Sequence, residues 1–352
     1  MNTVTVQTSR PYDVLIGSGL LSRCGSLIAD VTKARTCVVV SDSTVAPLYA
    51  YTVCCSLKDA GFTPHLITIP AGEQNKTLML CGDILSFFAR NGLTRSDLVV
   101  ALGGGVTGDI AGFSAAIYQR GVEFIQIPTT LLAACDASVG GKTGVDLPEG
   151  KNLAGAFHQP LLVICDTDSF KTLPAPILSE GMAEVIKHAL IADAQLLTTL
   201  MEQDPLSRIV DIVHRNVAIK SSIVSADEQE HGRRKILNFG HTLGHAIEKC
   251  SSYTIPHGNA VAIGMVLAAR AGEKLGHSPK GTLEAVVSAV THFGLPSTCV
   301  YRADELYAAA VSDKKRSGDR IDIVILKEIG RAETVPLSME ELRDFTEAAV
   351  CV

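Results

Sequence analysis

Short β-branched runs alternate with longer helix-like segments through the first half of the chain, and this alternation limits the possible folds more than any other feature. The predicted strands are Thr36–Ser41, Thr63–Ile69, Asp97–Leu102, Glu123–Pro128 and Leu161–Asp166. Strands separated by helices are typical of a mostly parallel sheet that helices cover. Ligands of such sheets bind at the carboxyl ends of the strands, where several of these runs end in polar residues or glycine.

After Pro174 and Pro176 the pattern changes to long apolar segments with helical periodicity. The expected helices are Leu178–Leu200, Leu206–Glu228, Gly240–Lys249, Asn259–Leu275 and Leu283–Phe293. The segments Ile321–Leu326 and Glu333–Val335 lie on either side of Gly330 and predict a small hairpin before a final helix. We therefore expect one domain over residues 1–174 and a second over residues 175–352.

Composition narrows the class of protein. A chain of 352 residues exceeds the size at which one core usually stops growing, and 47% hydrophobic with 19% charged residues is typical of a soluble enzyme. The net charge of −6 argues against a nucleic-acid partner. Because Met1–Arg10 is polar and no apolar run approaches membrane-spanning length, we expect a cytoplasmic protein without membrane contact. Its ten cysteines, without a CxxC pair, predict reduced thiols.

A glycine-rich segment follows the third predicted strand. Gly103, Gly105 and Gly108 have the spacing of a dinucleotide-binding turn, in which glycines let the backbone approach a pyrophosphate at a helix N-terminus. A purely structural turn explains such a segment about as well. Its position after a later strand than the first also argues against an ordinary Rossmann domain.

A second glycine turn precedes two lysines. Ser138–Thr143 ends like a phosphate-binding P-loop, but Asp136 stands where that motif requires its first glycine, which excludes a nucleoside triphosphatase. Lys142, Lys151 and Asn152 remain as candidate anion ligands, with solvated surface lysines as the simpler interpretation.

Histidines in the helical half suggest a metal site. His241 and His245 are spaced to share one helical face, His257 follows, and Glu184 lies on an earlier helix. This nitrogen and oxygen set suits zinc with an open coordination position, although a histidine pair is often only structural. Thr242 occupies the place of the general base in the zinc-protease motif, which excludes that class.

Taken in order, these segments resemble the 3-dehydroquinate synthase family. The resemblance runs from about Asp42 to Lys315 and rests on several motifs in register. They are Gly103–Phe113, Tyr118–Gly121, Ile127–Leu132, Ser138–Gly144, Gly150–Asn152, Met182–Lys187 and Asn238–His245.

The resemblance implies an α/β N-terminal domain, Rossmann-like with a mostly parallel sheet, and an all-helical C-terminal metal-binding domain. It implies NAD and one divalent metal, zinc or alternatively cobalt, as cofactors. The implied metal ligands are Glu184, His241 and His257. His245 would then face the substrate phosphate, whereas spacing alone would make it a ligand beside His241.

Further site residues follow from the resemblance. The implied cofactor contacts are Asp42, Glu73, Lys76, Gly104, Gly105, Val106, Asp109, Thr129, Thr130, Leu132, Lys151, Thr172 and Leu173. The implied substrate contacts are Asp136, Lys142, Asn152, Lys187, Lys220, Arg234, Asn238, His245 and either Lys314 or Lys315, with Arg120 supplied by the partner in a homodimer. Ile177 stands where the family usually has a glutamate, so that cofactor contact is not carried over.

The implied reaction converts a phosphorylated keto-acid into a carbocycle: transient oxidation by NAD, phosphate elimination, re-reduction and intramolecular aldol closure. Such a substrate carries two anionic groups. Lys142, Lys187, His245 and Arg120 suit its phosphate, while Arg234 and Lys220 suit its carboxylate.

Three other functions have to be weighed. Metal-dependent alcohol or glycerol dehydrogenases share the glycine-rich segment and the architecture, but need no phosphate-binding residues. Sugar-phosphate cyclases that act on substrates without a carboxylate are nearer, and Lys220 and Arg234 count against them. A non-catalytic NAD-binding regulator is disfavoured because Glu184, His241 and His257 are all present.

Overall fold

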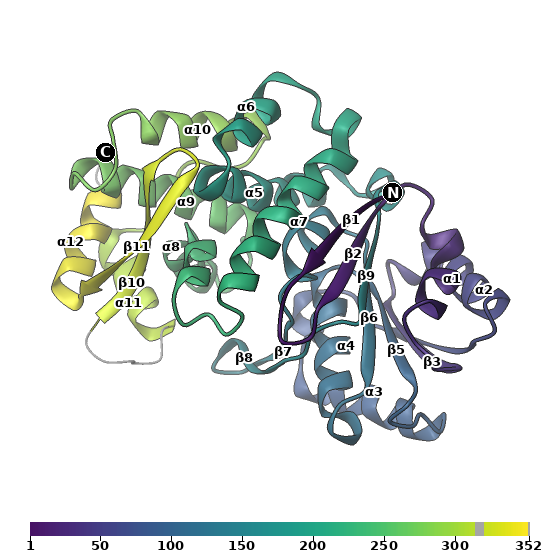
Figure 1. Ribbon diagram of the computed structural model, residues 1–352. Coiled ribbons are helices and arrows are strands. Elements are labelled where there is room, and N and C mark those ends of the chain that lie inside the picture. Colours follow the sequence, from purple (N-terminus) through teal and green to yellow (C-terminus); the bar gives the residue numbers. More distant parts are fainter. Residues whose placement is uncertain (314–319, 351–352) are drawn as a thin grey trace. The chain divides into compact units, whose positions relative to one another are not determined.

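A computed structural model describes residues 1–313 and 320–350 (Figure 1). The chain divides into two compact units, Met1–Leu173 with Ile209–Glu228, and Pro174–Arg208 with Gln229–Val352. Lys314 and Lys315 lie outside the described residues. No helix in the described part of the chain has both the length and the apolar character needed to cross a membrane.

The first unit contains a seven-stranded sheet in the order β1-β2-β9-β6-β5-β3-β4. Its strands are β1 (Asn2–Val6), β2 (Tyr12–Gly17), β3 (Thr36–Asp42), β4 (Thr63–Ile69), β5 (Leu98–Gly103), β6 (Glu123–Pro128) and β9 (Leu162–Asp166). All neighbours pair in parallel except β1 and β2, which are antiparallel. The five strands predicted from sequence are confirmed as β3, β4, β5, β6 and β9.

Helices cover both faces of this sheet. They are α1 (Cys24–Ala29), α2 (Tyr51–Asp59), α3 (Leu78–Arg90) and α4 (Gly105–Ile117). Alternate residues of β3 show the division: Val39 packs in a cluster with Leu57 of α2, whereas Val40 packs in another with Phe88 of α3. Burying such a side chain stabilises the fold by about 1.5–3 kcal/mol. Because the strands carry apolar residues on both sides, helices that cover both faces of the sheet are favoured.

The sequence did not predict two pairs of strands. Thr3-Val4-Thr5-Val6 alternates as an edge strand does, and Val4 of β1 lies opposite Val14 of β2. A separate hairpin, β7 (Lys142–Leu147) and β8 (Gly150–Phe157), forms where only a glycine turn was expected. Thr143 and Gly155 contribute to this hairpin despite their weak strand pattern.

Helix α7 (Ile209–Ala226) packs against β1 and β2 and belongs to the first unit, not to the second as the sequence boundary implied. Polar side chains explain this placement. Ser221 Oγ donates to the carbonyl oxygen of Thr5 at 3.1 Å, and Gln7 N donates to Ser225 Oγ at 3.1 Å. The helix thereby satisfies backbone groups at the edge strand.

Within residues 174–208, 229–313 and 320–350, the second unit is helical apart from one hairpin. Its helices are α5 (Ala175–Ala192), α6 (Ala194–Glu202), α8 (His241–Cys250), α9 (His257–Lys274), α10 (Thr282–His292), α11 (Ala303–Asp313) and α12 (Met339–Val350). The predicted hairpin is confirmed as β10 (Arg320–Glu328) and β11 (Arg331–Ser338). The single helix expected over Leu178–Leu200 is wrong: Asp193 leaves the helical conformation and caps α6 by accepting from Leu196 N at 2.9 Å.

Candidate active site

Three side chains that could hold a metal ion meet in the second unit. Glu184 lies on α5, while His241 and His257 begin α8 and α9. Their ligand atoms all lie within 4.8 Å of one another. The Nε2 atoms of His241 and His257 lie 3.4 and 3.6 Å from Oε1 of Glu184. Tetrahedral zinc, with bonds of about 2.0–2.1 Å, holds its ligand atoms about 3.3 Å apart, so this set fits a zinc-like ion.

Glycines set the spacing of the helices that carry these ligands. A Cβ atom at Gly264 of α9 would lie 2.0 Å from the carbonyl oxygen of Gly240, just before α8. A Cβ atom at Gly258 would lie 2.4 Å from the carbonyl oxygen of Glu180 on α5. Because no larger residue fits, the three backbones approach closely enough for short side chains to converge.

The two histidines differ in protonation. Burial lowers the pKa of His241 to about 4, which keeps its imidazole neutral and able to bind a metal. Burial also lowers the pKa of His257, but the carboxylates of Glu184 and Glu248 outweigh it and raise the pKa to about 10. A cation and a proton therefore compete for the same imidazole.

Two further predicted residues border these ligands. Nζ of Lys187 pairs with Oε2 of Glu184, and both side chains are almost fully buried. His245 lies one turn after His241, with ring centroids 5.4 Å apart. Potential ligand atoms group His245 with Glu248 and His257, whereas His241 is grouped with Glu184 and His257. The geometry thus does not pair the two histidines that spacing alone would pair.

A short helical turn, η8 (Arg233–Asn238), carries two more predicted substrate residues. The side chain of Arg234 is almost fully buried, and burial strengthens the attraction of a guanidinium for an anion. Asn238 Nδ2 donates to Glu230 Oε1 at 2.8 Å. Lys235 ties the turn to β10 through Asp322 at 2.6 Å. The segment is therefore held at several points.

The glycine-rich turn of the first unit joins β5 to α4. The N-cap residue of α4 is Gly104, which has no side chain to cap the first amides of the helix, so that these amides can face an anion. A Cβ atom at Gly104 would lie 3.3 Å from Cγ2 of Thr130, and one at Gly105 would lie 4.0 Å from Cδ2 of Leu132. The hydroxyl of Thr129 is buried and has no hydrogen-bond partner within residues 1–313 and 320–350. The structure thus brings these predicted cofactor residues together, beside Val106, the second residue of α4.

Asp42, another predicted cofactor residue, is bonded to α4 through Thr107. Its carboxylate accepts from the amides of Thr44 and Val45 at 2.9 and 3.0 Å, and from Thr107 Oγ1 at 3.0 Å. These bonds fix the carboxyl end of β3 relative to the glycine-rich turn.

A buried lysine links predicted cofactor and substrate residues. Nζ of Lys76 donates to Asp109 Oδ2 and to Asn152 Oδ1, both at 2.6 Å. Burial lowers the pKa of Lys76, but Asp109 and Glu73 raise it overall. Lys151 lies 3.8 Å from Glu73. Sequence reasoning missed this link because its partners are far apart along the chain.

Helix α7 brings Lys220 to a second predicted residue. Nζ of Lys220 lies 2.8 Å from Oδ1 of Asp136 and donates to its carbonyl oxygen at 2.5 Å. Lys142, at the start of β7, is exposed. Arg120 is exposed too, and its φ of 67° follows a φ of 49° at Gln119. Consecutive left-handed residues other than glycine store strain, which is common at functional positions.

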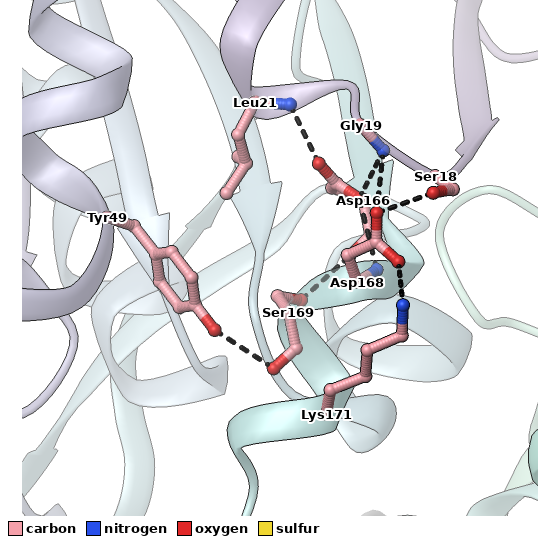
Figure 2. A network of polar contacts seen from close by, with 8 residues as sticks. All are labelled: Ser18, Gly19, Leu21, Tyr49, Asp166, Asp168, Ser169 and Lys171. Atoms are coloured by element: carbon pink, nitrogen blue, oxygen red, sulfur yellow. Dashed lines mark hydrogen bonds and ion pairs between the residues drawn. The ribbon is translucent and has the colours of Figure 1, made fainter.

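Figure 2 shows a network that fixes the carboxyl end of β9, which the sequence indicated only as a polar strand end. Asp166 accepts from the amides of Leu21 at 2.8 Å and of Gly19 and Asp168 at 3.0 Å. Lys171 donates to Asp168 at 2.6 Å. The turn after β2 is thereby held against the turn after β9.

The same network leads to the last two predicted cofactor residues. Tyr49 donates to the carbonyl oxygen of Ser169 at 3.1 Å (Figure 2) and its hydroxyl also bonds to Thr172. Thr172 ends the turn η6 (Thr167–Thr172), and Leu173 follows. Asp166 and Tyr49 therefore position this segment, although no sequence motif pointed to them.

The fold of this chain, an α/β unit and a helical unit, is that of the sugar-phosphate cyclases. The structure of 2-epi-5-epi-valiolone synthase from Streptomyces hygroscopicus, with NAD⁺ and Zn²⁺ bound, has a TM-score of 0.86 at 28% identity, covering 96% of each chain. For 2-deoxy-scyllo-inosose synthase with carbaglucose-6-phosphate, NAD⁺ and Co²⁺, the TM-score is 0.87 at 24% identity, covering 98% of this chain and 99% of that one.

Sequence comparison identifies the family within this class. The family model for the 3-dehydroquinate synthase N-terminal part matches residues 66–180, and the model for the C-terminal part matches residues 181–316. A 3-dehydroquinate synthase of Streptococcus suis is 43% identical over 96% of this chain and 97% of its own length. The chain belongs to the 3-dehydroquinate synthase family.

Proposed function

We propose that this chain converts 3-deoxy-D-arabino-heptulosonate 7-phosphate into 3-dehydroquinate and phosphate, the second step of the shikimate pathway to aromatic amino acids. One observation carries the proposal: the buried ammonium of Lys187 pairs with Glu184, a carboxylate of the metal-binding set. A proposed metal ligand and a cation suited to a leaving phosphate therefore lie side by side. Full-length similarity to 3-dehydroquinate synthases supports it.

Glu184, His241 and His257 would hold one divalent ion, zinc or cobalt, as their mixed oxygen and nitrogen donors suggest. When bound, the ion would stabilise negative charge on a substrate oxygen. Burial of Glu184 and His241 keeps competing water from most of the set.

The glycine-rich turn, with the buried hydroxyl of Thr129, fits a bound NAD. NAD would supply a hydride acceptor that returns the hydride within the same cycle. Lys76 and Asp109, paired at 2.6 Å, would fix the hairpin residue Asn152 relative to α4.

The remaining residues would hold the substrate. Lys187 and His245 suit the phosphate, with Lys142 and Asn152 from the first unit and Arg120 from a partner. Arg234 and Lys220 suit the carboxylate, where a guanidinium can bind with two hydrogen bonds. The phosphate so held can accept the proton that must leave the substrate, which leaves positioning as the main task of the protein.

We also propose a cytoplasmic homodimer. The cysteines of residues 1–313 and 320–350 are free thiols, in keeping with a reducing compartment. The exposed Arg120, held at a strained φ of 67°, suits a side chain that reaches a neighbouring copy.

The decisive experiment follows phosphate and NADH together, with substrate in excess, NAD in catalytic amount and zinc or cobalt present. We expect phosphate to accumulate over many turnovers without free NADH, because product and lost phosphate together have the oxidation level of the substrate. NADH rising in proportion to substrate consumed, without phosphate, would support a dehydrogenase instead. Lys187→Ala should reduce phosphate release while metal content stays the same, since Lys187 is not a ligand.

A further inference from the structure

The two ring nitrogens of His257 face different carboxylates. Nε2 lies 3.6 Å from Oε1 of Glu184, toward the metal-binding set. Nδ1 lies 3.4 Å from Oε2 of Glu248. A neutral imidazole has one N–H and one lone pair, so the group beside one nitrogen decides what the other nitrogen can bind.

Glu248 is placed to make that choice. It lies on α8 two turns after His241, and its side chain is only 2% exposed. Its backbone carbonyl is also fixed, because the amide of Tyr253 donates to it at 2.7 Å. A carboxylate buried this deeply requires hydrogen-bond donors, and Nδ1 of His257, at 3.4 Å, lies within reach of it.

We infer that Glu248 is a positioning residue that accepts the Nδ1–H of His257 and so reserves Nε2 for a divalent ion held with Glu184 and His241. The inference rests on the metal site of the proposed function. Carboxylates behind metal-binding histidines fix the tautomer and the ring orientation, and raise the basicity of the ligand.

The other possible role of Glu248 is that of a ligand. Its oxygen, together with His245 and His257, forms a second set whose atoms lie within 4.8 Å of one another. A metal ion in that set would bind the lone pair of Nδ1. The N–H of the neutral ring would then be at Nε2, beside Glu184. The first arrangement is favoured because two imidazoles, those of His241 and His257, face the same Glu184 oxygen.

The test measures Co²⁺ affinity by chelator competition, together with the visible spectrum and the X-ray absorption of the bound ion. Glu248→Ala should weaken Co²⁺ binding by about 10–100-fold without changing the number of protein ligands. Glu248→Gln should recover part of the affinity, because its amide oxygen can accept the same hydrogen bond. The Co²⁺ affinity of Glu248→Gln also tests the inference if Glu248→Ala does not fold.

Glu180→Gln is the matched control. Glu180 is half-buried and acts on His257 through its charge, so the substitution separates a charge effect from a hydrogen bond to Nδ1. We expect it to change Co²⁺ affinity less than Glu248→Gln does. An equal or larger loss would overturn the inference.

Two further outcomes are distinct. If the unmodified protein binds no Co²⁺, the metal site of the proposed function fails. If it binds Co²⁺ and both Glu248 variants bind it equally tightly, or if Glu248→Ala removes one oxygen ligand from the ion, the positioning role is wrong while the proposed function stands.

Discussion

At the scale of single residues, His257 lies between two buried carboxylates, so its substitution is the most direct test of the proposed metal site. Replacing it with alanine removes one of the three proposed ligands and also removes an imidazole neighbour of the buried carboxylates of Glu184 and Glu248. We expect His257→Ala to lose both bound metal and turnover. Metal content after dialysis and the rate of phosphate release measure this, with the exposed His292→Ala as control. Active, metal-free His257→Ala protein would contradict it.

Arg234 offers a second test at this scale. Because its guanidinium is almost fully buried, losing it should leave the substrate carboxylate poorly paired, at a cost of about 2–5 kcal/mol in substrate binding. Calorimetric titration of Arg234→Ala should show this loss for substrate but little change for NAD. Lysine at this position should restore only part of it. An equal loss for both ligands would show that Arg234 does not contact the substrate carboxylate.

The residues of the candidate site could be predicted from sequence, but the side chains with which they pair could not. The family resemblance implied Lys76 as a cofactor contact and Asn152, Lys220 and Asp136 as substrate contacts. Only the structure shows Lys76 bonded to Asn152 and Lys220 bonded to Asp136. Such pairs depend on tertiary packing, which leaves no periodic signal in the chain.

At the scale of elements, close helix contacts determine whether the ligands meet. A Cβ atom at Gly264 would lie 2.0 Å from the Gly240 carbonyl oxygen, so Gly264→Ala must push α9 away from α8. Overpacking of this kind costs about 1–3 kcal/mol, and we expect a lower melting temperature with weaker metal retention.

Gly82→Ala is the matched control for this prediction. Gly82 lies within α3, and nothing lies within 4 Å of its added Cβ atom. Alanine should therefore keep or raise the melting temperature, since it is the better helix former by about 1 kcal/mol. If the two variants melt alike and hold metal alike, tight packing of α8 and α9 is not what places the ligands.

Elements with a strong pattern were predictable and those with a weak pattern were not. The buried strand β6 matches its predicted bounds, because burial on both faces produces a continuous apolar run. The edge strand β1 alternates with polar residues and was missed. The break at Asp193 was missed because apolar periodicity continues across it, while the cap depends on one side chain.

At the scale of the whole molecule, chain order does not match spatial order. The prolines at 174 and 176 mark the end of the first stretch of the α/β unit, but α7 returns to that unit and carries Lys220. Hydrophobic periodicity identifies α7 as a helix without indicating which sheet it covers. A single domain boundary in the sequence could not describe a unit that is built from two separate stretches of chain.

The proposed dimer can be tested through its shared site. Arg120→Ala and His257→Ala should each be inactive alone. Arg120→Ala lacks a phosphate ligand, and His257→Ala lacks a metal ligand. After subunit exchange, half of the dimers are mixed, and each mixed dimer has one site with an intact metal set and an Arg120 from its partner. Activity should then return to about a quarter of the unmodified level.

Mixing Arg234→Ala with His257→Ala is the control for this prediction. Arg234 and the metal ligands are proposed to serve the same chain's site, so no mixed dimer would contain a complete site and activity should stay absent. Light scattering establishes first whether the protein is a dimer. If it is, and the Arg120→Ala mixture also stays inactive after exchange, Arg120 acts within its own chain. Recovery in both mixtures would instead mean that Arg234 crosses the interface as well.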